Sequence, residues 1–137
     1  MVNIVKEEQP DVFLLCGDVY HTSQPSAAVQ TMFTNALVQI RDANPGMTIV
    51  ITAGNHDSGS KHDIFRTPWK ALKVYTVGCI DASQKEELVV EVPGKGYVIA
   101  VPYVNERNMP KGFFQELIDF AKGDEAGPVD KLRDLLI

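Results

Sequence analysis

Two short polar motifs, each placed directly after an apolar run, contain the residues of this sequence best suited to metal and proton chemistry. The motif GDVYH occupies residues 17–21, and the motif GNHD occupies residues 54–57. Asp18 comes at the end of its apolar run, where a carboxylate is partly desolvated and held by rigid backbone. A carboxylate has two oxygens and can bridge two divalent cations about 3.5–4 Å apart, the spacing of two-metal phosphoryl-transfer sites.

The second motif offers a further metal ligand and a proton donor. The amide oxygen of Asn55 can bind a cation without adding negative charge that would repel a phosphate. Together with Asp18 it favours Mg, Mn or Fe over a thiolate-bound structural zinc. His56 could donate a proton or a hydrogen bond to charge that develops on a phosphate, which makes it the candidate catalytic residue. Asp57 could orient the His56 ring. His21 could hydrogen-bond to a metal ligand without binding the metal itself.

Each of these residues also has an ordinary structural interpretation. An aspartate after a strand-ending glycine is often a turn or helix-capping residue, and Gly-Asn is a common turn dipeptide. A single histidine is more often a surface residue than a ligand. Two independent turns would rarely place G-D-x-x-H after one strand and G-N-H-D after the next, so the pair of motifs favours one shared site.

The elements around the motifs predict an α/β fold with a strand, a helix and a strand at its core. Residues 12–16 (VFLLC) are typical of a central strand buried on both faces. Apolar residues recur at helical spacing from 26 to 42, after the start signals Pro25 and Ser26. Residues 47–53 (MTIVITA) predict a second strand. Parallel strands in such a unit bring both motifs to one edge of the sheet.

The remaining sequence predicts further elements of a single domain, residues 1–137. Residues 2–9 resemble the last turns of a helix that leads into the first strand, so the chain is expected to begin partway through a truncated domain. Four more elements are expected: a short helix over 64–72, a strand over 74–77, a β-hairpin over 87–101 and C-terminal helices from residue 113 onward.

The charge of the chain limits how it could meet nucleic acid. A net charge of −5 argues against a surface that attracts DNA as a whole, because phosphate binding uses clustered Lys and Arg. The densest positive stretch follows GNHD directly and could contact a DNA backbone near the metals. A solvated helix face is the alternative interpretation. The candidate DNA contacts are Lys61, Arg66, Lys70 and Lys73.

The sequence predicts a cytoplasmic protein without a membrane anchor. No apolar run reaches the roughly 20 residues that span a bilayer, and the opening residues lack the layout of a signal peptide. Cys16 and Cys79 lie in apolar surroundings. They are predicted to be buried free thiols rather than a disulfide.

The two motifs resemble the second and third motifs of the calcineurin-like metallophosphoesterase superfamily, G-D and G-N-H-[DE]. The segments PDVFLLCGDVYHTSQPSAAVQ, NPGMTIVITAGNHDSGS and VIAVPYVN are similar, more narrowly, to bacterial nuclease subunits of the SbcD type. The resemblance spans most of residues 1–105. It implies that Asp18 bridges two metal ions, that Asn55 binds one of them, and that His56 assists at the scissile phosphate without binding metal.

The same resemblance implies cofactors and partners. The expected cofactors are two divalent metal ions, with Mn favoured and Mg or Fe as alternatives. DNA would be the substrate of an exonuclease or endonuclease reaction, and an SbcC-type ATPase subunit would be the partner. A homodimer would form through parts of the parent protein that these residues do not contain.

The sequence departs from the superfamily pattern at three places. Relatives begin with Asp-x-His on the first strand and complete the site with a separate His and with Gly-His-x-His, none of which is found here. Metal affinity depends on the number of ligands. This partial metallophosphoesterase domain is therefore expected to bind metal weakly or not at all, and to be inactive by itself.

Two other functions stay open from the residues alone. The same fold and chemistry could act on a small phosphodiester or a phosphoprotein, since a fold does not fix a substrate. The second open function is that of a non-catalytic α/β module. Such a module would be either a degenerate binding domain or a receiver-like switch with Asp18 at a strand end. GNHD has no role in a receiver-like module and the hairpin breaks strand-helix alternation, so the phosphoesterase is favoured.

Overall fold

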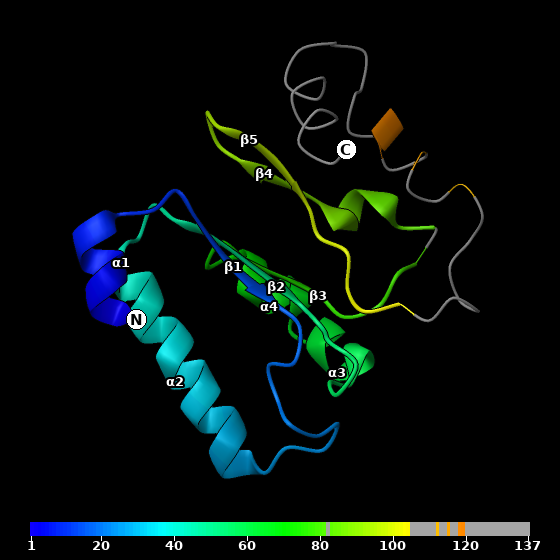
Figure 1. Ribbon diagram of the computed structural model, residues 1–137, viewed down its shortest axis with the longest axis horizontal. Helices are drawn as coiled ribbons and strands as arrows, with labels where there is room; N and C mark the ends of the chain where they lie inside the picture. Colours follow the sequence, from blue (N-terminus) through cyan, green and yellow to red (C-terminus); the bar gives the residue numbers. More distant parts are fainter. Residues whose placement is uncertain (82, 105–111, 113–114, 116–117, 120–137) are drawn as a thin grey trace.

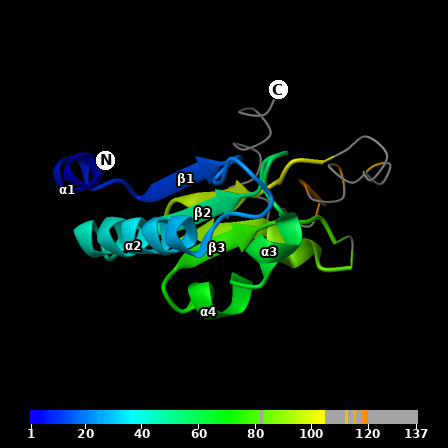
Figure 2. The same cartoon turned by 90° about the horizontal axis from the view of Figure 1, so that it is seen from below.

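A three-stranded parallel sheet forms the centre of the computed structural model, which describes residues 1–81, 83–104, 112, 115 and 118–119. The strands are β1 (Val12–Cys16), β2 (Thr48–Thr52) and β3 (Val74–Val77), in the order β1-β2-β3. Both pairings are parallel. Figure 2 shows the strands side by side, with their carboxyl ends at the same edge of the sheet. The predicted strand-helix-strand core and the α/β class are confirmed.

Helix α2 (Ala27–Ala43) connects β1 to β2 and begins where the sequence predicts. The Ser26 hydroxyl accepts a hydrogen bond from the Val29 backbone N–H at 3.3 Å, which satisfies one of the free donors at the start of a helix. Helix α1 (Val2–Glu8) precedes β1, as the opening residues predict. Figure 1 shows both helices on the same side of the sheet.

Strand β2 is buried at all five positions because both of its faces are covered. Successive side chains of a strand point to opposite faces. Ile49 and Ile51 accordingly belong to a cluster with Leu37 and Ile40 of α2, while Val50 belongs to a second cluster on the other face.

The second face of the sheet is covered by an antiparallel hairpin. It consists of β4 (Val89–Val92) and β5 (Gly96–Ile99), preceded by the 3₁₀-helix η1 (Lys85–Leu88). The hairpin prediction is confirmed, although its first residues form η1 instead of strand. Leu88 and Val90 pack with Val50 of β2, which joins the hairpin to the sheet.

Two predictions about burial are wrong. Strand β1 is an edge of the described three-stranded sheet, and Leu14 is 50% exposed, because the hairpin cluster is centred on β2 and β3. Cys16 and Cys79 are free thiols but are exposed. The short helix predicted over 64–72 is confirmed as α4 (Arg66–Lys70), and a further short helix, α3 (Gly59–Asp63), precedes it. Pro68 lies in the first turn of α4, where the N–H that proline lacks would have no partner within the helix.

The predicted C-terminal helices lie almost wholly outside the described residues. Within the part of the chain that the structure describes, no helix is both long enough and apolar enough to cross a bilayer.

We expect the stability of the fold to depend on the core of β2. Ile51 is fully buried, so Ile51→Ala should lower the free energy of unfolding by about 2–5 kcal/mol through lost contacts and a residual cavity. Ile64→Ala is the matched control, because Ile64 is 70% exposed and the same change should stay within about 0.5 kcal/mol. Urea unfolding followed by circular dichroism measures both. Equal losses in the two variants would contradict the assignment of β2 to the core.

Candidate metal centre

The GDVYH and GNHD loops leave neighbouring strands and meet at the carboxyl edge of the sheet. The backbone N–H of Gly17 donates to the carbonyl of Thr52 at 2.9 Å, which extends the pairing of β1 and β2 into the loops. Gly17 has a φ of +79°, in the region that favours glycine. A Cβ placed on Gly54 would lie 2.2 Å from both the backbone nitrogen and the Oδ1 of Asp18. The approach of the two loops therefore requires a glycine at position 54.

Asp18 and Asn55, the two predicted metal ligands, lie next to each other. The Asn55 amide terminus is 3.2 Å from both carboxylate oxygens of Asp18. In one orientation its nitrogen donates to them. In the other orientation the Asn55 amide oxygen faces the two Asp18 oxygens, and a cation can then bind between these three acceptors. The backbone N–H of His56 also donates to Asp18 Oδ1, at 3.0 Å, and Asp18 itself has a φ of +45°.

These two residues fit part of a site for a hard divalent cation. Carboxylate and amide oxygens are the ligand types that Mg and Mn prefer. They do not complete a site, because no group of three or more His, Cys, Asp or Glu able to hold a metal ion occurs among the described residues. The cleft beside them is lined by the ends of β1 and β2 and by residues 101–103, whose Tyr103 N–H donates to the Ala53 carbonyl at 2.7 Å.

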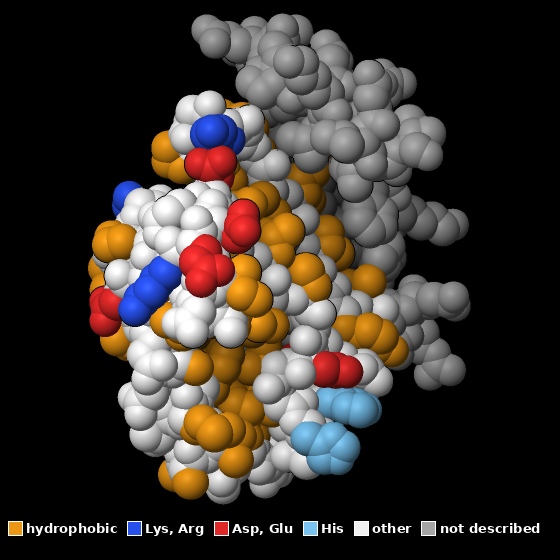
Figure 3. Space-filling view, turned by 60° about the vertical axis from the view of Figure 1, so that its left-hand side comes forward, with side chains coloured by type: hydrophobic (Ala, Val, Ile, Leu, Met, Phe, Trp, Pro, Cys, Tyr) orange, Lys and Arg blue, Asp and Glu red, His pale blue; other side chains and the backbone are white. Residues whose placement is uncertain are grey.

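His56 and His21 lie together on the surface beside Asp18. The His56 side chain is 51% exposed, and its Nδ1 is 3.9 Å from Asp18 Oδ2. The rings of His21 and His56 meet edge to face with centroids 5.8 Å apart. Figure 3 shows histidine side chains next to an acidic side chain at one end of the molecule. The His56 ring can thus reach a phosphate in solvent, and His21 can limit how that ring turns.

Asp57 does not take the position that the sequence suggested for it. Its carboxylate was expected to orient the His56 ring, but its oxygens are occupied by backbone donors of both loops and its side chain is fully buried. Oδ2 accepts from Val19 N–H at 3.0 Å and from Gly54 N–H at 2.8 Å. Oδ1 accepts from Tyr20 N–H at 2.9 Å. Asp57 therefore fastens the GDVYH loop to the GNHD loop, and we call this arrangement the Asp57 clamp.

Burial and the negative charge of Asp57 raise the pKa of the Tyr20 phenol above its usual value. A phenol is already protonated at physiological pH, and the upward shift keeps Tyr20 neutral to still higher pH. It therefore adds no second negative charge next to the buried carboxylate.

Asp63 has a similar role at the end of β3, which sequence reasoning missed. Its carboxylate accepts from the backbone N–H groups of Gly78 at 2.8 Å and Cys79 at 3.1 Å. Backbone capping by an aspartate leaves no signal in the sequence other than the residue type, so neither this contact nor the Asp57 clamp could be told from an ordinary turn.

The four candidate DNA contacts do not form one basic surface. Arg66 pairs with Asp63 at 2.6 Å, and Lys70 pairs with Glu87 at 2.6 Å. Lys73 directly precedes β3, at the amino edge of the sheet, opposite the motifs. Lys61 is closer to the motif loops, because its Nζ donates to the Ser23 carbonyl at 3.0 Å. Lys61 is thus the member of the set that contacts the segment following the GDVYH motif.

Similar sequences occur among phosphoesterases and nucleases. The family described as calcineurin-like phosphoesterase matches residues 1–125. A relative from Rhodobacter capsulatus, named as the SbcD subunit of the nuclease SbcCD, is 28% identical over 116 residues, covering 78% of this chain and 29% of that protein. The protein of the same name from Bacillus subtilis is 30% identical over 98 residues, covering 72% and 24%. This chain spans between 24% and 29% of the length of these curated relatives.

We expect Gly54→Ala to disrupt the meeting of the two loops. The added Cβ would collide with the backbone of Asp18, so the free energy of unfolding should fall by about 2 kcal/mol or more. Gly46→Ala is the control, since a Cβ there would meet only Asn44 Oδ1, at 3.6 Å. Urea unfolding of the two variants measures the difference, and matching midpoints would show that the loops are not in close contact.

Asp57→Asn should weaken the Asp57 clamp. An amide presents one acceptor oxygen and turns a nitrogen toward backbone donors, so we expect a loss of about 3 kcal/mol in the free energy of unfolding. The exposed Asp42 provides the same chemical change without a buried carboxylate, and Asp42→Asn should be close to neutral. Thermal unfolding compares them. A neutral Asp57→Asn would mean that the three backbone bonds contribute little.

Proposed function

Because this chain belongs to the calcineurin-like phosphoesterase family, we propose that it is part of a metal-dependent DNA nuclease subunit of the SbcD type that hydrolyses phosphodiester bonds. The observation that carries the proposal is the meeting of Asp18 and Asn55, 3.2 Å apart, with His56 exposed beside them. Three groups suited to phosphate chemistry thus come from two loops that are far apart in the sequence.

Each residue has a proposed role at this site. Asp18 and Asn55 would hold divalent cations, with Mn favoured and Mg or Fe as alternatives. When bound, such cations would supply charge stabilisation and an activated water. His56 would donate a hydrogen bond or a proton to the phosphate oxygen on which charge develops. Its ring is exposed beside Asp18, so a phosphate can approach it from solvent.

The ligand set is incomplete among the residues that the structure describes. Two oxygen-bearing side chains hold a divalent cation only weakly, because affinity rises with the number of ligands. We propose that the remaining ligands, which the Asp-x-His and Gly-His-x-His motifs would provide, come from segments that this sequence does not include. This chain by itself would then bind metal weakly and would not cleave DNA.

The proposed substrate and partner follow from the similar proteins. Both relatives carry the name of a subunit of the nuclease SbcCD, so we propose DNA as substrate and an SbcC-type subunit as partner. A cytoplasmic location and a homodimer formed through other parts of the protein belong to the same proposal. Lys61 would meet the DNA backbone near the metals, while the ion-paired Arg66 and Lys70 would contribute less.

The proposal predicts which version of the protein cleaves DNA. Mn-dependent cleavage of end-labelled linear DNA should be absent or very slow for this chain and present for a version extended at both ends by the neighbouring coding sequence. In the extended protein, His56→Ala should lower the rate by about 10²–10⁴-fold, the usual contribution of a general acid. Asp42→Asn, which changes an exposed residue away from the motifs, should leave the rate unchanged.

The alternative functions give other outcomes in the same assay. Hydrolysis of a small phosphodiester without DNA cleavage would keep the metal chemistry and remove the nuclease assignment. Inactivity on both substrates would favour a non-catalytic member of the family. The receiver-like alternative is already disfavoured, because the chain matches a phosphoesterase family and carries the antiparallel β4–β5 hairpin.

A further inference from the structure

A buried histidine outside the two motifs lies against the Asp57 clamp. His62, in α3, is only 4% exposed. Its Nε2 is 3.7 Å from Oδ1 of Asp57, and this nitrogen has no hydrogen-bond partner within the described structure. Buried polar nitrogens are nearly always hydrogen-bonded, so an unpartnered one beside a buried carboxylate calls for an explanation.

The Asp57 carboxylate can accept one more hydrogen bond, which explains why the His62 nitrogen lies beside it. An ionised carboxylate offers about four lone-pair positions to donors. Backbone N–H groups of Val19, Tyr20 and Gly54 occupy three positions on Asp57. His62 approaches from α3, a different element. A shift of about 0.5 Å would bring its Nε2 within ordinary hydrogen-bond distance of Oδ1 and fill the fourth position.

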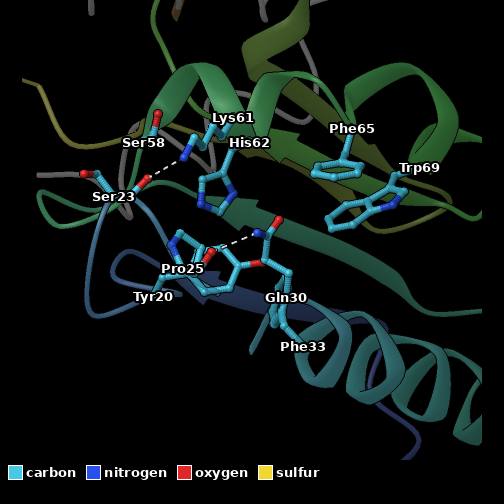
Figure 4. A pocket seen from close by; sticks show the side chains of 10 residues that line it. All are labelled: Tyr20, Ser23, Pro25, Gln30, Phe33, Ser58, Lys61, His62, Phe65 and Trp69. Carbon is cyan, nitrogen blue, oxygen red and sulfur yellow. Dashed lines mark hydrogen bonds between the residues drawn. The ribbon is translucent and has the colours of Figure 1, made fainter. Parts of the chain in front are cut away.

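The surroundings of His62 hold its ring in this direction. Figure 4 shows the ring in a pocket lined by both aromatic and polar side chains, with Tyr20 and Phe33 on one side and Phe65 and Trp69 on another. The centroids of His62 and Tyr20 are 5.9 Å apart. Ser23, Gln30 and Ser58 also line this pocket, but Asp57 supplies a charged acceptor 3.7 Å from Nε2 and is therefore the favoured partner for a proton on that nitrogen.

We propose that His62 is a positioning residue, which acts through Asp57 on the two loops that carry Asp18, Asn55 and His56. It donates from Nε2 to the Asp57 carboxylate and so fixes the orientation in which that carboxylate receives the three backbone N–H groups. The effect on metal binding rests on the proposed function. The effect on the loops does not, since it involves only groups of this chain.

The alternative is that His62 only fills space among the aromatic rings. Two variants of similar length separate the roles. Glutamine at position 62 keeps an N–H donor, whereas methionine has nearly the same size and shape but no donor. A role in packing predicts that the two behave alike, and a role through Asp57 predicts that they differ.

Backbone hydrogen exchange in the metal-free chain is the first measurement. In His62→Met, the amides of Val19, Tyr20 and Gly54 should exchange about tenfold faster than in the wild type, while His62→Gln should stay within about threefold. The Ile49 amide, which donates to Lys73 within the sheet, reports global opening and should change little in either variant. Equal exchange of the three loop amides in both variants would overturn the proposal.

Two controls keep the result decisive. Phe65→Leu alters the same pocket without a group near Asp57, and should leave the three loop amides unchanged. The wild type gives an answer even if His62→Met does not fold, because long-range ¹H–¹⁵N spectra show which ring nitrogen carries the proton. A proton on Nε2 at neutral pH is expected. An unprotonated Nε2 could not donate to Asp57 and would refute the proposal.

Manganese binding to the version extended at both ends, followed by electron paramagnetic resonance, tests the consequence for the site. His62→Met should weaken Mn²⁺ affinity by about tenfold and His62→Gln by no more than about threefold, the size typical for residues that support metal ligands indirectly. Asp18→Asn tests the metal site itself. If Asp18→Asn leaves Mn²⁺ binding unchanged, the proposed function fails, while the exchange data still decide the role of His62.

Discussion

The geometry of the candidate site depends on the buried carboxylate of Asp57. Loops that leave the ends of parallel strands carry backbone N–H groups that no neighbouring strand satisfies, and buried donors need partners. Asp57 accepts three of them from two loops, and these charge-assisted bonds offset the cost of burying the carboxylate. Asp18 and Asn55 are thus held together by a residue that is not itself one of the proposed metal ligands.

The fold was predictable wherever the local pattern decides the structure. The spacing of apolar residues and the Ser26 cap located α2, and the β-branched run located β2. Local patterns do not show which faces other elements cover. The all-apolar run of β1 therefore suggested burial on both faces, whereas Leu14 is half exposed because the hairpin packs mainly on β2 and β3.

The candidate site was predictable in its membership but not in the roles of its parts. Motif spacing brought Asp18, Asn55 and His56 together because parallel strands end at one edge of a sheet. The actual partners of Asp57 depend on where backbone donors point after folding, which residue types alone do not specify. The same limit applies to the basic stretch. Asp63, three residues earlier in the chain, pairs with Arg66, and the more distant Glu87 pairs with Lys70.

The sequence separation between Asp57 and its partners also determines when the Asp57 clamp can form during folding. Val19 and Asp57 are 38 residues apart, and all of α2 lies between them. A contact over such a separation forms only after the entropy of closing the intervening chain has been overcome. Until then, water is the partner of the Val19 and Tyr20 N–H groups. A growing chain that has not yet reached residue 57 therefore carries its first motif without the hydrogen bonds that fix the loop around Asp18.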